Sequence, residues 1–150
     1  MTEFLLILHI LSAAAWIGGG LLTGFVAPRM ARAGSEASLG WARVSAAAGT
    51  RYFNPAGILT LLSGIGLVLT SDIYDWSDTF VSIGLGIAIA ASLIGALAHR
   101  SGSGRLIAAL ESGDQVTAAA EGKKAAIWGT VTAGLLIVAV VVMVVKTGVG

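Results

Sequence analysis

Two histidines, three methionines and no cysteine limit the chemistry that this chain can perform. His9 is the only ionisable side chain inside any of the four long apolar stretches of the sequence. Such a group is costly in a bilayer helix and marks a candidate functional site. The lack of cysteine excludes disulfides, thiolate metal sites, cysteine nucleophiles and covalent haem attachment. His9 is therefore the first candidate for a metal or cofactor ligand.

The partners available to His9 follow from its depth. Six residues separate it from Glu3, which places it about 9 Å along a helix and inside one leaflet. His99 adjoins Arg100 at the opposite surface, so the two histidines of one chain cannot share a metal or a haem. Met143 falls in the layer of His9, and a His/Met pair suits Cu(I) or a haem iron.

Each of these residues also has an ordinary interpretation. Met143 fits a packing side chain in a valine-rich helix. His9 fits an imidazole that is hydrogen-bonded to a hydroxyl or carbonyl of a neighbouring helix, for example at Thr70 or Ser71. Trp16, seven residues after His9, shares its helix face and would line the same candidate cofactor site.

No catalytic residues can be assigned. The acidic segment 72–78 lacks the glycine turn and terminal glutamate of a calcium loop, and it reads as an exposed turn flanked by interfacial aromatics. The sequence has no G-x-S-x-G elbow. No carboxylate falls within the apolar stretches, which argues against a transporter with intramembrane acidic ligands.

These candidates must be positioned by membrane helices. The chain is 56% hydrophobic and 11% charged, against about 25% charged for soluble proteins. Crossing a bilayer takes about 20 helical residues. We predict an all-α, polytopic membrane protein, a bundle of four transmembrane helices in one domain spanning residues 1–150. The predicted helices are 3–27, 54–71, 79–99 and 124–146.

The basic residues predict the orientation. Eight of the nine lie in the segments 28–53 and 100–123 or at their edges, and only Lys146 lies on the other side. Positively charged loops stay in the cytoplasm. We therefore expect both termini outside, in a bacterial-type plasma membrane, with no affinity for nucleic acid. Residues 35–47 predict a short helix at headgroup level, residues 101–104 predict a chain break, and Asp114 predicts a helix cap.

Small residues predict where the helices pack. Gly20 and Gly24 form a G-x-x-x-G pair on the face of His9, and bulky residues occupy the opposite face. The other predicted packing positions are Gly57 and Gly64 in the second span and Gly84 and Gly95 in the third.

The first helix resembles a known pattern. Residues 8–19, LHILSAAAWIGG, are similar to the histidine and tryptophan-x-glycine first helix of copper-resistance D-like membrane proteins and of the uncharacterised integral membrane family DUF2269. The likeness extends to residues 59–67 and 76–86. Related first helices occur in the HemJ-type protoporphyrinogen oxidases. The resemblance implies a helical bundle that handles copper or haem, with His9 at the matched position.

Three functions follow as hypotheses. The first is a non-enzymatic membrane module or accessory subunit, which packs against itself or against partner helices in a larger membrane complex. The second is copper or haem binding through His9, completed by Met143 or by a second subunit. The third is a membrane oxidoreductase of the HemJ kind.

Overall fold

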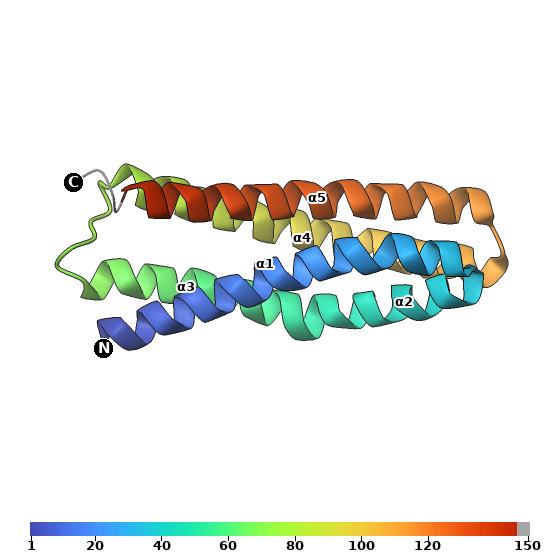
Figure 1. The fold of residues 1–150 in the computed structure, drawn as a ribbon, viewed down its shortest axis with the longest axis horizontal. Helices are drawn as coiled ribbons and strands as arrows, with labels where there is room; N and C mark the ends of the chain where they lie inside the picture. Colours follow the sequence, from blue (N-terminus) through green and yellow to red (C-terminus); the bar gives the residue numbers. More distant parts are fainter. Residues whose placement is uncertain (147–150) are drawn as a thin grey trace.

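The computed structural model describes residues 1–146, and for residues 98–101 and 146 it describes the backbone alone. Every described element is a helix (Figure 1). In chain order these are α1 (Thr2–Ala33), α2 (Ser35–Ala48), the short π-helix η1 (Gly49–Phe53), α3 (Asn54–Thr70), α4 (Thr79–Ser112) and α5 (Gln115–Lys146). The predicted all-α fold class is therefore confirmed.

Four helical stretches are long and apolar enough to cross a membrane: α1, the run from α2 to α3, α4 and α5. They run up and down, and the start of α1 and the end of α5 lie at the same end of the bundle (Figure 1). The 34 residues of α4 extend for about 51 Å, well beyond a hydrocarbon core of about 30 Å. α4 is therefore longer than a hydrocarbon core is thick.

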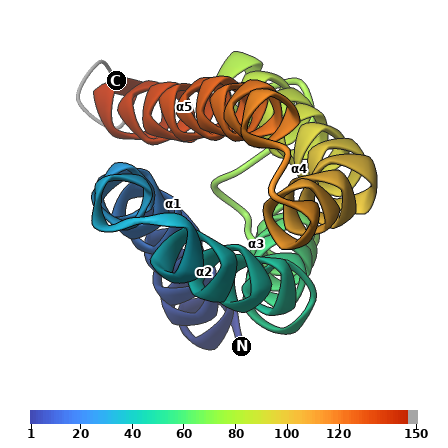
Figure 2. The same ribbon diagram turned by 90° about the vertical axis from the view of Figure 1, so that its right-hand side faces the viewer.

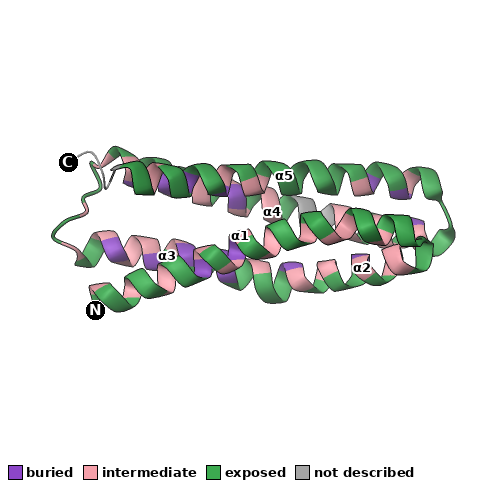
Figure 3. Ribbon diagram, viewed as in Figure 1, coloured by how far each residue is buried: buried purple, intermediate pink, exposed green. Residues whose placement is uncertain are grey.

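The bundle is built from two closely packed pairs. α1 packs mainly on α3 and α4 mainly on α5, while α2 bridges α1 and α4 (Figure 2). Trp16, Ala56, Ala91 and Leu136 form the core where the pairs meet. Buried residues form narrow stripes along the helices, and most other residues are half-buried or exposed (Figure 3). This suits helices whose outer faces meet lipid, because small residues at the contacts let the backbones approach.

The predicted break at residues 101–104 is wrong. α4 continues through Gly102 and Gly104 to Ser112. Two glycines cost about 1 kcal/mol each in a helix, but tertiary contacts to α5 offset this cost. Glu121 of α5 is buried, pairs with Arg105 of α4 at 3.6 Å, and lies 3.9 Å from where a Cβ of Gly102 would be.

The predicted loops 28–53 and 100–123 are also helical over most of their length. Residues 35–48 form the expected short helix, but α2 does not lie across the end of the bundle at headgroup level. It continues through η1 into α3 and runs beside α1 and α4 (Figure 1). Its Arg43 forms a 2.7 Å ion pair with Glu111 of α4, which favours packing along the bundle.

Two glycines and one carboxylate make the sharp turns. Gly34 (φ 118°) separates α1 from α2 and Gly113 (φ 75°) ends α4, both in backbone conformations that side chains disfavour. Asp114 then accepts hydrogen bonds from the backbone N–H and the hydroxyl of Thr117, as the sequence predicts for a helix cap. These bonds hold the pKa of the Asp114 carboxyl below its ordinary value.

Candidate functional site

His9 faces α3 and is held there by its ring. Its Nδ1 lies 2.9 Å from the carbonyl oxygen of Thr60 and 3.3 Å from the hydroxyl oxygen of Ser63. A carbonyl oxygen can only accept, so Nδ1 must carry the proton and donate it. The neutral ring then has its lone pair on Nε2. Among the described residues, no hydrogen bond reaches Nε2.

Three hydroxyl groups complete a polar cluster beneath the imidazole. Ser12, Thr60 and Ser63 are all buried, at 6%, 7% and 2% exposure. The Thr60 hydroxyl lies 3.0 Å from that of Ser12, which in turn donates to the carbonyl of His9. The Ser63 hydroxyl donates within its own helix to Leu59. Every hydroxyl in this cluster is satisfied, so the cluster ties α1 to α3 without an orphan polar group.

Glycines in α3 make room for the large side chains of α1. A Cβ on Gly64 would lie 3.0 Å from Cε1 of His9, and a Cβ on Gly57 would lie 3.3 Å from the Trp16 ring. Gly66 leaves similar space for Leu5, at 3.2 Å. Each glycine is a notch that admits one side chain, so the imidazole and the indole lie directly against the α3 backbone.

These contacts define the register of two antiparallel helices. Successive contacts step along α1 and back along α3: Thr2 with Thr70, Leu5 with Gly66, His9 with Ser63 and Gly64, Ser12 with Thr60, Trp16 with Gly57, and Gly19 with Phe53. In this register Thr70 accepts a hydrogen bond from Thr2. Thr70 and Ser71, the example partners of His9 from the sequence, therefore lie about two helical turns from it.

Two aromatic residues that the sequence does not mark as part of this interface, Tyr52 and Phe53, contact α1 at its other end. The Tyr52 hydroxyl donates to the Ala15 carbonyl at 2.8 Å. The Tyr52 and Phe53 rings pack edge to face and both cover Gly19. Both belong to η1, where the widened helical turn directs two successive aromatics at α1. Pro55, which lacks an N–H, lies two residues after the end of η1 and is the sequence signal for this irregular turn.

Met143 lies against a different helix. Its Cε methyl would be 2.6 Å from a Cβ on Gly84, so it fills a glycine notch in α4. His9 contacts α3 instead, and none of the described contacts joins the two side chains. His99 lies outside the residues whose side chains are described. Among the described residues, no three His, Asp or Glu side chains could hold a metal ion together.

The remaining glycines of the predicted packing stripes are open. A Cβ on Gly20, Gly24 or Gly95 would meet no heavy atom within 4 Å. Gly20 is partly exposed and Gly24 is exposed. The G-x-x-x-G pair of α1 is therefore not used inside this chain, in contrast to Gly57, Gly64 and Gly84.

Asp75 and Asp78, in the acidic segment between α3 and α4, accept hydrogen bonds from that same segment. Asp75 accepts from the Ser77 backbone at 2.8 Å, and Asp78 accepts from the Asp75 backbone at 3.0 Å. The hydrogen bonds from Ser77 lower the pKa of the Asp75 carboxyl. This geometry is that of an exposed turn stabilised by its side chains.

Comparisons of the chain with known proteins gave no match. No protein-family model matches the chain, and no curated protein or solved structure matches it at a significant level. The resemblance to a known family thus rests on residues 8–19, 59–67 and 76–86 of the sequence alone.

Proposed function

We propose that this chain is a non-enzymatic module of a membrane complex, and that its first helix packs against a partner helix through Gly20 and Gly24. The observation that carries this function is the difference between two sets of glycines. Gly57, Gly64 and Gly84 each hold a side chain of the same chain, whereas Gly20 and Gly24 hold none. Small residues in membrane helices mark close helix contacts. The open pair therefore favours a contact with a helix of another subunit.

The polar cluster supports the same role. Three hydrogen bonds join α1 to α3: those of His9 with Thr60 and Ser63, and that of Thr60 with Ser12. A rigid α1–α3 pair presents the open face of α1 in a fixed orientation. The partner is a second copy of this chain or a helix of a different membrane protein.

Native electrophoresis after mild solubilisation tests this function. We expect the wild-type chain in a species above monomer size, and we expect Gly20→Leu with Gly24→Leu to shift it to the monomer. Gly18→Leu is the matched control, because Gly18 is exposed, is equally open and points away from Gly20 by about 200° around the helix. A wild-type chain that migrates only as a monomer would overturn the function.

Copper or haem binding is the second candidate, and the tautomer of His9 favours it. Donation from Nδ1 to a backbone carbonyl fixes the ring and leaves Nε2 with a free lone pair, as in metal-binding histidines. Met143 faces Gly84, so a further ligand would come from elsewhere, for example His9 of a second copy. A visible spectrum and metal analysis of the purified protein decide the matter. A Soret band or bound copper that is lost in His9→Ala supports this candidate, and its absence sinks it.

We infer that the chain lies in a bacterial-type plasma membrane with both termini outside. The opposite end of the bundle, which contains the segments 28–53 and 100–123, is then cytoplasmic. The bias of the basic residues supports this orientation, as does the position of the start of α1 and the end of α5 at one end of the bundle. Because the chain has no cysteine, a single Ser77→Cys variant can be labelled by an impermeant maleimide on whole cells. Labelling is expected for this orientation, and protection would reverse it.

A further inference from the structure

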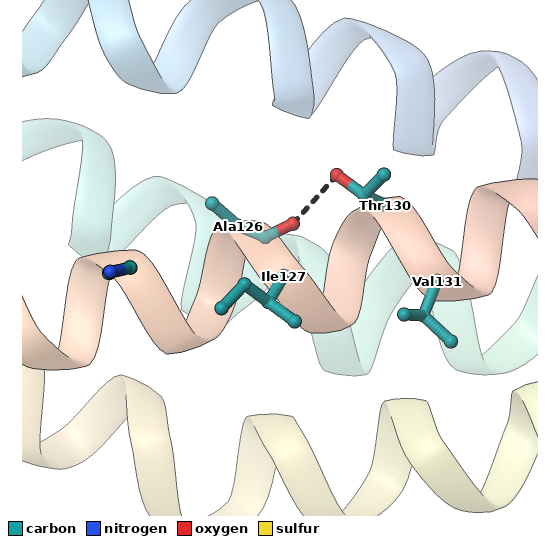
Figure 4. A pocket seen from close by; sticks show the side chains of 5 residues that line it. Ala126, Ile127, Thr130 and Val131 are labelled. Atoms are coloured by element: carbon teal, nitrogen blue, oxygen red, sulfur yellow. Dashed lines mark hydrogen bonds between the residues drawn. The ribbon is translucent and has the colours of Figure 1, made fainter.

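One side of α5 carries a shallow groove in the N-terminal half of that helix. Its volume is about 320 Å³, and it is lined by Lys123, Ala126, Ile127, Thr130 and Val131. All five residues are exposed. Figure 4 shows the four labelled residues following one another along α5. The groove begins at a cation and continues into the apolar part of the helix.

The groove offers almost no polar group along its length. Its one hydroxyl, that of Thr130, donates to the Ala126 carbonyl at 2.9 Å (Figure 4). Thr130 therefore contributes mainly its methyl group. The eight helical steps from Lys123 to Val131 rise by about 12 Å, and one leaflet of hydrocarbon is about 15 Å thick. The length and polarity match one acyl chain that lies along the helix.

The charge at the head of the groove is unbalanced. Lys124 forms a 2.8 Å ion pair with Glu121, and Arg105 approaches the same carboxylate at 3.6 Å. Among the residues whose side chains are described, no carboxylate lies within ion-pair distance of Lys123. Lys123 therefore has its ammonium group available for an anion at headgroup level.

We propose that this groove binds an anionic phospholipid of the surrounding bilayer, with one acyl chain along Ala126 to Val131 and the phosphate at Lys123. The ammonium group of lysine binds phosphate as a point charge. An anionic headgroup gains more from it than a zwitterionic one. The groove residues belong to α5, whereas the open glycines Gly20 and Gly24 belong to α1.

Lipid titration of the full-length purified protein, followed by native mass spectrometry, tests the site. We expect the first phosphatidylglycerol to bind more tightly than the first phosphatidylcholine. Lys123→Gln should weaken phosphatidylglycerol binding about five-fold, which corresponds to the loss of one basic contact, and leave phosphatidylcholine unchanged. Arg32→Gln is the matched control, because it removes an exposed cation from the end of α1 and should leave both lipids unchanged.

A second variant tests the groove itself. Ala126 is exposed, so Ala126→Phe fills the groove without disturbing the core, and it should weaken both lipids. Unchanged lipid selectivity in Lys123→Gln, or unchanged binding in Ala126→Phe, would overturn the site. Millimolar glycerol phosphate should not displace phosphatidylglycerol. Displacement would show a free-phosphate site and would equally overturn the acyl-chain assignment.

Discussion

The Nδ1 atom of His9 lies 2.9 Å from the carbonyl oxygen of Thr60, across the interface between α1 and α3. This one contact has two consequences. It sets the tautomer of the only histidine inside an apolar stretch, and it fixes the axial position of α1 on α3. A half-buried histidine whose Nδ1 donates to a backbone carbonyl contributes to helix packing. Its free Nε2 is what keeps ligand binding open as a second role.

Replacing Gly64 with alanine should destabilise the α1–α3 interface. The new Cβ would lie 3.0 Å from Cε1 of His9 and would push the ring off its hydrogen bond. Overpacking of this kind costs about 1–3 kcal/mol, which outweighs a gain of about 1 kcal/mol in helix propensity. Thermal unfolding in detergent measures the difference.

Gly95→Ala is the matched control for that experiment. A Cβ there meets nothing within 4 Å, so only the propensity gain remains. We expect the stability of Gly95→Ala to be unchanged or slightly raised. Equal stabilities for the two variants would show that His9 does not occupy the notch at Gly64.

Removal of the Tyr52 hydroxyl should weaken the other end of the interface. Tyr52→Phe keeps the ring on Gly19 and loses the hydrogen bond to the Ala15 carbonyl. Hydrogen bonds between membrane helices average about 0.6 kcal/mol, so we expect a loss of this size in the free energy of unfolding. Tyr74→Phe, in the segment between α3 and α4, should lower the free energy of unfolding by less. A loss in Tyr74→Phe as large as that in Tyr52→Phe would contradict the assigned role.

The turn between α4 and α5 should depend on Gly113. Its φ of 75° lies in the left-handed region, where a non-glycine residue costs about 1–2 kcal/mol. Gly113→Ala should therefore lower the unfolding temperature. Gly104→Ala, in open space within α4, should raise it slightly because alanine favours the helix. Opposite signs for the two variants are the expected result, and a stabilised Gly113→Ala would rule out the left-handed turn.

The cap of α5 should make stability depend on pH. The pKa of Asp114 is lowered by hydrogen bonds from Thr117, so the ionised carboxylate favours the folded state. This contribution is complete above the ordinary pKa of aspartate, about 3.9. It is lost as pH falls through the lower pKa of the folded protein. Wild type should unfold at a higher temperature than Asp114→Ala at pH 7, and the difference should shrink at pH 3.

The sequence was sufficient for the fold class but not for the register. Hydropathy and basic residues mark four spans, and the stripe of Gly57, Thr60 and Gly64 marks the face of α3 that meets α1. Helical periodicity says which face a residue occupies and says nothing about axial offset. This is why Thr70 stood as a partner of His9, about two turns from Ser63.

Glycine is the residue type whose meaning the sequence left most open. Gly102 and Gly104 predict a break, yet α4 continues through them, and the adjacent Arg105 pairs with Glu121 of α5. Gly20 and Gly24 read as a packing pair, and no side chain of this chain fills them. Propensity and spacing describe one helix at a time, whereas these outcomes depend on which neighbour lies alongside.

Photo-crosslinking from position 24 tests the proposed packing role most directly. The chain has no cysteine, so Gly24→Cys can carry a single benzophenone in native membranes, and Leu22→Cys, about 200° around α1, serves as its control. If α1 packs on a partner helix, illumination should give a discrete protein adduct above monomer size from position 24 and none from position 22. Only lipid adducts at position 24, or the same protein adduct from both positions, would contradict a partner helix at Gly20 and Gly24.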